Sequence, residues 1–306
     1  MKIIVAGGTG LIGSNLLKRL AGKNDIVLFT RDQEAAQKQF EGAGFQIVSW
    51  DQPEEQLLGV IQHSDALINL SGAGIADARW SSARRQTLEN SRLKSIEKLV
   101  TLLKKGDIKL KVVLQASAVG YYGNHEEKMF AEKDTAGDNY LAGLTEKWER
   151  KATEFQPYTE RLVLLRTGMV LTPEGGALKP LMLPFKLFAG GRMGSGKQWI
   201  SWIDMEDQIE AILFLLKKND SRAAYNLTAP QPIRQRSLAA AIGKALSRPN
   251  WLPVPGFMLK LLMGQMAVEM LLEGNHVKPD RLIEAGYIFQ SPDINTALKH
   301  LIGSSA

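Results

Sequence analysis

Residues 1–13 place a short apolar strand, a glycine-rich turn and the start of a helix directly one after another. Ile3 to Val5 read as a buried strand, and glycines follow at Gly7, Gly10 and Gly13. A helical spacing of leucines then begins at Leu16. A strand, a glycine turn and a helix in this order are typical of a dinucleotide-binding βαβ unit. The spacing is G-x-x-G-x-x-G, which differs from the G-x-G-x-x-G of ordinary dehydrogenases.

Each glycine of this turn has a predicted physical role. Gly7 permits the tight turn, Gly10 leaves room for a pyrophosphate near the backbone, and Gly13 lets the helix pack closely on the strand. The N–H groups and the positive end of the helix dipole would then face the phosphates. The predicted cofactor contacts of this segment are Gly7, Thr9, Gly10, Leu11, Ile12 and Gly13.

Strands alternate with helices through most of the chain. We expect seven strands, over residues 3–5, 25–30, 45–50, 65–70, 109–116, 161–166 and 225–227, and a long helix over residues 81–105. Right-handed crossovers between such strands give a doubly wound parallel sheet. The predicted fold class is therefore α/β: a Rossmann sheet with a smaller, mostly helical C-terminal substrate domain.

The regular alternation ends near residue 170. We assign residues 1–170 and 206–229 to the dinucleotide-binding domain, and residues 171–205 and 230–306 to a substrate or lid domain. Two glycine-rich loops, at 171–176 and 190–199, are expected to lie over the cofactor, because long ordered loops tend to be functional. A methionine-rich stretch at 257–272 reads as core or interface.

The tip of the second strand predicts which dinucleotide fits. The strand ends at Thr30-Arg31. An arginine there can fork onto the 2′-phosphate of NADP, so NADP(H) is favoured over NAD(H). In the alternative, Arg31 is solvated and Asp32 binds the ribose of NAD. Further cofactor contacts are predicted at Thr30, Asp51, Leu70, Ser71, Gly72, Arg92 and Ser117.

Composition narrows the classes of function. The 306 residues contain no cysteine, and the four histidines are not spaced as metal ligands, so no metal site is predicted. No apolar run approaches the length of a membrane span, and the strand that starts at residue 2 leaves no room for a signal peptide. The net charge is +6, but the basic residues are spread along the chain. We therefore expect a cytoplasmic protein with a small-molecule substrate, without nucleic-acid or membrane binding. The oligomeric state stays open, a homodimer included.

Taken together, the motifs resemble those of the extended short-chain dehydrogenase/reductases. More narrowly, the chain resembles their NAD(P)-dependent epimerase-like subgroup over essentially its whole length. The motifs that carry this resemblance are Arg79-Trp80, Ser91-Arg92, Lys147-Trp148-Glu149, Gly175-Gly176-Ala177-Leu178, Gly194-Ser195-Gly196-Lys197-Gln198-Trp199, Ser201-Trp202-Ile203-Asp204, Arg248-Pro249, Leu271-Leu272-Glu273-Gly274 and Glu284-Ala285-Gly286-Tyr287. The resemblance implies a bound pyridine nucleotide.

The catalytic pair of that superfamily, Tyr-x-x-x-Lys, is missing. Four residues beyond Tyr140 stands Leu144, and Lys147 lies seven residues along. A rearranged enzyme would use Ser117 to polarise a carbonyl and Tyr121, Tyr122 or Tyr140 as proton donor. Two functions therefore stay open: an oxidoreductase or epimerase-like enzyme, and a non-catalytic NADP(H)-binding sensor or structural protein.

Overall fold

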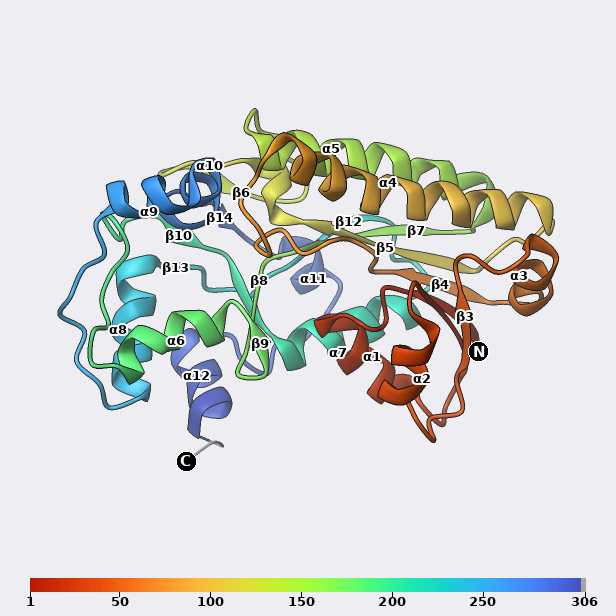
Figure 1. Ribbon diagram of the computed structural model, residues 1–306, viewed down its shortest axis with the longest axis horizontal. Helices are drawn as coiled ribbons and strands as arrows, with labels where there is room; N and C mark the ends of the chain where they lie inside the picture. Colours follow the sequence, from red (N-terminus) through yellow and green to blue (C-terminus); the bar gives the residue numbers. More distant parts are fainter. Residues whose placement is uncertain (304–306) are drawn as a thin grey trace.

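The computed structural model describes residues 1–303 and is organised around a seven-stranded parallel sheet (Figure 1). In spatial order its strands are β12 (Ala223–Leu227), β7 (Leu162–Thr167), β5 (Val112–Ala118), β4 (Ala66–Asn69), β1 (Lys2–Ala6), β2 (Asp25–Thr30) and β3 (Gln46–Ser49). All seven predicted strands are present. They form because their apolar runs are buried on both faces, as in β1, where Ile3 to Ala6 are fully buried.

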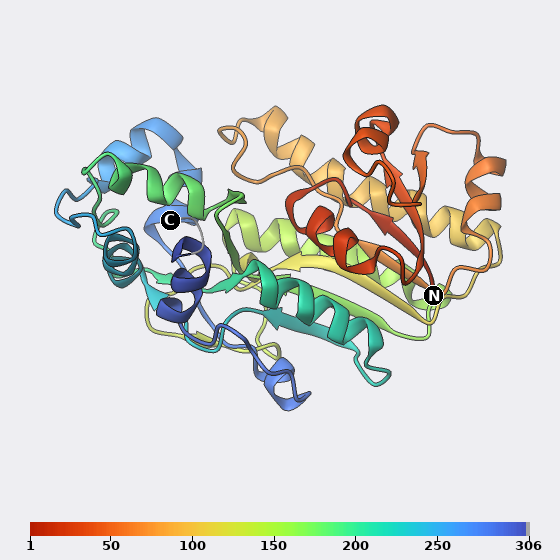
Figure 2. The same cartoon turned by 90° about the horizontal axis from the view of Figure 1, so that it is seen from below.

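Helices cover both faces of this sheet, which confirms the doubly wound fold. On one face lie α1 (Leu11–Leu20), α2 (Gln33–Gln39) and α7 (Met205–Lys217), whose apolar residues share a cluster with the strands. On the other face lie α3 (Glu54–Ile61), α4 (Ser82–Lys105), α5 (Tyr140–Ala152) and the short η2 (Thr153–Tyr158). Helices α1 and α7 lie beneath the sheet in Figure 1 and side by side in front of it in Figure 2.

Polar side chains at the helix starts fix where these helices begin. The side chains of Asp32, Ser81, Asn139 and Asp204 accept from backbone N–H groups in the first turns of α2, α4, α5 and α7. Such caps satisfy donors that have no partner within the helix. The predicted helix over 81–105 matches α4, which starts one residue later because Ser81 is its cap.

A C-terminal lobe occupies the end of the molecule far from β2 and β3 (Figures 1 and 2). It is mostly helical and contains α6 (Leu178–Lys186), α8 (Gln235–Ala245), α9 (Gly256–Met263), α10 (Gln265–Ala267), the π-helical η3 (Val268–Leu272) and α12 (Ile294–Gly303). The short α11 (Asp280–Glu284) lies outside this lobe, beside the sheet (Figure 1). Short strand pairings connect the lobe to the rest: β11 (Trp202–Asp204) with β8 (Met169–Thr172) and β9 (Gly175–Gly176), and β14 (His276–Val277) with β6 (Met129–Phe130). Within the lobe, β10 (Trp199–Ile200) pairs with β13 (Ile233–Arg234).

Separate cores lie on the two sides of the proposed domain division. One cluster of buried side chains gathers residues from α6, β10, β11, α8 and α12, among them Trp202. The sheet has its own clusters on either face. Two segments cross the proposed boundary. Ile203 and Met205 pack in the sheet cluster, and so does Leu282 of α11, where Arg281 Nη1 donates to the Ala224 carbonyl of β12 at 2.8 Å. The division at 171 and 230 stays a prediction.

Candidate nucleotide-binding cleft

A cleft of about 750 Å³ opens at the carboxyl ends of the central strands. It lies beside β1, β2, β3 and β4, and the chain order reverses between β1 and β4. Ligands of open α/β sheets bind at such a reversal, because the connections leave in opposite directions there. Nine of the predicted cofactor residues line this cleft: Gly7, Thr9, Gly10, Thr30, Arg31, Asp51, Leu70, Ser71 and Gly72.

The glycine turn has the geometry that a close backbone approach requires. Gly7 has φ +78°, and a Cβ there would lie 2.6 Å from the carbonyl carbon of Leu70. A Cβ on Gly13 would lie 2.4 Å from the Gly7 carbonyl oxygen, so Gly13 allows α1 to pack on the turn. Gly10 is different, because a Cβ there would meet only Gly7 O, at 3.4 Å.

The start of α1 is open toward this cleft. Gly10 is the N-cap residue of α1, and no side chain caps the helix or places a carboxylate in its first turn. An uncapped helix N-terminus offers N–H groups and a positive dipole end to an anion. Leu11 and Ile12 supply that first turn without lining the cleft with their side chains, and Leu11 instead contacts Gly175 and Gly176.

The far end of the cleft is aromatic and basic. Phe29 and Trp50 line it with ring centroids 4.8 Å apart, and exposed Arg31 and Asp51 stand at its rim. Asp32, the alternative ribose ligand, accepts from Ala35 N at 2.9 Å as the cap of α2. The Asp32 carboxylate is therefore already engaged in capping α2, and Arg31 is the better placed of the two residues to meet the ribose.

Helix α4 forms one wall of the cleft, which the sequence analysis missed. It contributes Thr87, Asn90, Ser91, Lys94, Ser95 and Lys98. Lys98 Nζ also donates to the Trp50 carbonyl oxygen. The sequence does indicate this wall, because these polar residues recur every three to four positions and therefore share one side of the helix. With Arg31, the two lysines give the cleft three cations against one carboxylate, Asp51.

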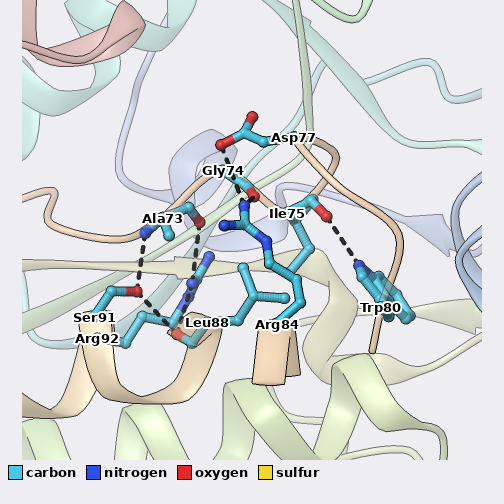
Figure 3. A network of polar contacts seen from close by, with 9 residues as sticks. All are labelled: Ala73, Gly74, Ile75, Asp77, Trp80, Arg84, Leu88, Ser91 and Arg92. Carbon is cyan, nitrogen blue, oxygen red and sulfur yellow. Dashed lines mark hydrogen bonds and ion pairs between the residues drawn. The ribbon is translucent and has the colours of Figure 1, made fainter. Parts of the chain in front are cut away.

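The loop after β4 is fastened to α4 (Figure 3). Ser91 Oγ accepts from Ala73 N at 2.9 Å, Arg84 Nη2 donates to the Gly74 carbonyl at 2.5 Å, and Trp80 Nε1 donates to the Ile75 carbonyl at 2.9 Å. Upstream, the buried Asn69 side chain accepts from Ser71 N at 3.2 Å. These bonds hold the Ser71–Ala73 edge of the cleft in place.

Arg92 does not line the cleft, contrary to the prediction. Its Nη1 donates to the carbonyls of Ala73 and Leu88, and its guanidinium lies 4.9 Å from the Trp148 ring. A Cβ on Gly72 would stand 3.3 Å from the Arg92 Cζ, so Arg92 supports this edge from behind. Burial lowers the pKa of Arg92 to about 10. Arg92 therefore holds in place the loop from which Gly72 and Ala73 line the cleft.

Ser117 also lies away from the cleft. Strand β5 runs two residues further than predicted, so Ser117 sits inside the strand opposite Arg166 of β7. Side chains alternate across a strand, and Ser117 faces α5, where its Oγ donates to Glu149 Oε1 at 2.5 Å. It is 4% exposed. Polarising a substrate carbonyl would require this bond to break.

Glu149 and Arg166 form the centre of this buried network. Arg166 Nε and Nη2 each donate to a Glu149 carboxylate oxygen at 2.8 Å, and its Nη1 donates to the Tyr122 hydroxyl at 2.9 Å. Tyr122 in turn donates to Asn226 Oδ1 at 2.7 Å. Burial acts to lower the pKa of Arg166, but the hydrogen bonds and charge of Glu149 raise it overall. Burial raises the pKa of Tyr122 to about 12. The network ties β5, β7, β12 and α5 together.

The three candidate tyrosines have different surroundings. Tyr122 is held in the network, and the Tyr140 hydroxyl is buried without a hydrogen bond while its ring packs on Trp80 at 4.9 Å. Tyr121 is half-buried in η1 (Val119–Tyr122), and its ring lies 3.6 Å from the Arg166 guanidinium. Tyr121 is therefore the candidate that is neither held in the network, as Tyr122 is, nor buried at its hydroxyl, as Tyr140 is.

No tyrosine–lysine pair forms on α5. Lys147 lies on the exposed side of the helix and pairs with Glu89 of α4 at 3.0 Å. The Thr145 hydroxyl of the same helix donates to the Leu141 carbonyl at 2.7 Å. On this helix Lys147 therefore does not lie beside Tyr140, in agreement with the missing Tyr-x-x-x-Lys spacing in the sequence.

The second glycine-rich loop does not cover the cleft. None of residues 190–199 lines it. Gly194 N donates to the Val254 carbonyl at 2.9 Å, and Gln198 Nε2 donates to the Leu271 carbonyl at 2.6 Å, so this loop packs within the C-terminal lobe. The first loop comes closer, since Gly175 and Gly176 approach Leu11.

Comparison with known proteins agrees with this architecture. The NAD dependent epimerase/dehydratase family matches residues 3–143, and a domain of unknown function (DUF1731) matches residues 254–301. The chloroplastic epimerase family protein SDR39U1 homologue of Arabidopsis thaliana is 36% identical over 99% of this chain and 87% of its own length. An epimerase family protein of Staphylococcus aureus is 35% identical over 98% of both chains.

A solved structure is similar over the whole chain. The human epimerase family protein SDR39U1, crystallised with NADPH, superposes with a TM-score of 0.87 at 29% identity and covers 99% of both chains. The match therefore extends through the C-terminal lobe as well as the sheet. The chain belongs to the NAD dependent epimerase/dehydratase family.

Proposed function

We propose that the protein binds NADP(H) in the cleft between β1 and β4. The observation that carries this proposal is the cleft itself: an uncapped helix N-terminus behind Gly10 and three cations, at the chain reversal of a Rossmann sheet. The NADPH of the human relative supports it. Gly7 and Gly10 would face the pyrophosphate, Arg31 the 2′-phosphate, and Phe29 with Trp50 the adenine end.

For the reaction, the proposal is oxidoreduction or epimerase-like chemistry on a small carbonyl or hydroxyl compound. When bound, NADP(H) supplies or accepts the hydride. The protein would hold the dinucleotide and exchange one proton with the substrate oxygen. Tyr121 does not line the cleft, but it follows the carboxyl end of β5, the neighbour of β4 in the sheet, so it is the proposed proton donor in place of Ser117.

A specific observation favours a second candidate function. The Ser117 hydroxyl is bonded to Glu149, and Lys147 pairs with Glu89 on the exposed side of α5. A protein that binds NADP(H) without turnover, as a sensor or a structural element, would need neither group. The two functions share the nucleotide cleft and differ only in whether NADPH is consumed.

Arg31→Ala is expected to weaken NADPH binding roughly ten- to a hundredfold while leaving NADH binding unchanged. The reason is that a charged hydrogen bond to the 2′-phosphate contributes about 1.5–3 kcal/mol. Titration of both dinucleotides by quenching of tryptophan fluorescence measures this. Arg150→Ala, an exposed arginine on α5, is the control. An unchanged NADPH preference in Arg31→Ala would remove the 2′-phosphate assignment.

Turnover, if the protein is an enzyme, is expected to depend on Tyr121. A positioned proton donor contributes about 10²–10⁴-fold to rate, so Tyr121→Phe should lose about 10²-fold or more with unchanged NADPH affinity. Lys147→Met should keep the rate, because Lys147 pairs with Glu89 on the exposed side of α5. The assay is NADPH oxidation against a panel of aldehydes, ketones and quinones. Tight NADPH binding without oxidation of any panel member would select the non-catalytic function.

A further inference from the structure

The net positive charge of the chain comes from one part of the C-terminal lobe. Residues 175–203 and 230–268 contain nine Lys or Arg and no Asp or Glu. The other residues hold the remaining 29 of the 38 basic side chains and all 32 acidic ones, a net charge of −3 against +6 for the whole chain. The basic residues are spread along the sequence. The uneven distribution of net charge arises because these two segments lack acidic residues.

The same segments expose apolar side chains. Nine of the thirteen strongly exposed large apolar residues in the described chain belong to them. Helix α9 has the sequence Gly-Phe-Met-Leu-Lys-Leu-Leu-Met, and none of its residues is buried. Phe257 is 72% and Leu261 76% exposed. A helix that is apolar on every side is normally buried in a core or in lipid. One side of α9 is half-buried, through Leu259 and Met263, and its exposed side lacks the partner that the composition calls for.

Two loops continue this surface beyond α9. Trp251 Nε1 donates to the Phe188 carbonyl at 2.9 Å, and Val254 forms a parallel bridge with Met193. The chain from 188 to 194 therefore runs alongside 251 to 254, at the end of the molecule that carries α9 (Figure 1). Phe188 and Trp251 are 56% and 66% exposed. We call the surface made by Phe188, Trp251, Phe257, Leu261 and Leu262 the apolar edge.

Cations flank the apolar edge. Lys186, Arg192, Arg248 and Lys260 are exposed along the same segments, and the Arg248 guanidinium lies 4.5 Å from the Phe188 ring. Lysine and arginine stems cover apolar surface while their charged ends stay in water. Aromatic and leucine side chains between such cations are the pattern of a surface that lies in a membrane interface.

We propose that the apolar edge docks onto an anionic lipid surface, with α9 lying in the headgroup region. Charge complementarity argues for this occupant, because anionic headgroups attract the nine cations of the two acid-free segments, which outnumber the exposed Glu273 that lies beside Phe257 and Lys260. A symmetric contact with a second copy would bring the same cations together. Docking at an interface needs no membrane span, and no helix within residues 1–303 is long and apolar enough to provide one. This differs from the sequence-based expectation of no membrane contact.

The test is flotation of the full chain with vesicles of phosphatidylcholine alone or of phosphatidylcholine mixed with phosphatidylglycerol. The protein should float with the mixed vesicles, remain unbound with phosphatidylcholine, and be released by salt. Leu261→Ser and Lys260→Glu should each weaken partitioning about tenfold, because each removes an apolar or a charge contact. NADPH titration of the same variants checks that they fold, since neither Lys260 nor Leu261 lines the nucleotide cleft.

Matched controls lie outside the surface. Ile288→Ser removes an apolar side chain that is 86% exposed, and Lys104→Glu reverses an exposed charge at the end of α4. Both should float like the original protein. Equal binding to both vesicle types, or no binding to either, would overturn the proposal. A concentration-dependent dimer that Leu261→Ser dissolves would assign the edge to a second copy instead, and retention on duplex DNA with no flotation would assign it to nucleic acid.

Discussion

Glu149→Ala is expected to lower the free energy of unfolding by about 3–5 kcal/mol. The substitution leaves the Arg166 guanidinium, which is 5% exposed, buried without its counter-charge. It also removes the acceptor of the Ser117 hydroxyl. Because the network joins β5, β7 and α5, the loss should appear in the global urea unfolding transition followed by circular dichroism. If the alanine variant does not fold, Glu149→Gln, which keeps the shape and removes the charge, gives the milder version of the same measurement.

An exposed ion pair on the same helix serves as the control. Lys147→Ala breaks the contact with Glu89, and such solvent-exposed pairs contribute about 0–1 kcal/mol. Ser117→Ala should fall between the two, since it removes one hydrogen bond and leaves the ion pair intact. If Glu149→Ala and Lys147→Ala have the same free energy of unfolding, the buried network does not support the sheet.

Gly10→Val is expected to abolish NADPH binding while the protein remains folded. Gly10 has φ −76° and ψ 175°, an extended conformation that any residue adopts. An added Cβ meets only the Gly7 carbonyl oxygen, at ordinary contact distance. The branched side chain would therefore be tolerated by the protein and would occupy the space in front of α1 that the pyrophosphate needs. NADPH titration and urea unfolding of the same sample measure the two effects separately.

Gly13, in the same motif, does not tolerate a side chain. A Cβ there would stand 2.4 Å from Gly7 O and 2.6 Å from Gly8 Cα, both backbone atoms of the turn. Gly13→Ala should therefore destabilise the fold itself. If Gly10→Val binds NADPH normally and stays folded, the phosphates lie somewhere other than the N-terminus of α1.

The sequence alone determined the sheet and the position of the nucleotide cleft. Both follow from local information: apolar runs bounded by turns define strands, and the glycine turn between the first strand and helix needs glycine at Gly7 and Gly13, where a side chain would collide with backbone atoms. Thr30, Arg31, Asp51 and Leu70 lie at the cleft because they end parallel strands, and the carboxyl ends of such strands share one edge. The missing Tyr-x-x-x-Lys was also visible, since four-residue spacing on a helix is a local property.

The tertiary structure decided which polar side chains face the cleft and which are committed elsewhere. Ser117 and Tyr122 look like site residues in the sequence, yet their hydroxyls are bonded to Glu149 and Asn226, which lie 32 and 104 residues away in the chain. The contributions of Lys94 and Lys98 depend on how α4 packs beside β4. The apolar edge likewise depends on two acid-free segments meeting at one end of the molecule. Such contacts join residues distant in sequence, so no local pattern specifies them, and the packing of helices and strands alone brings them together.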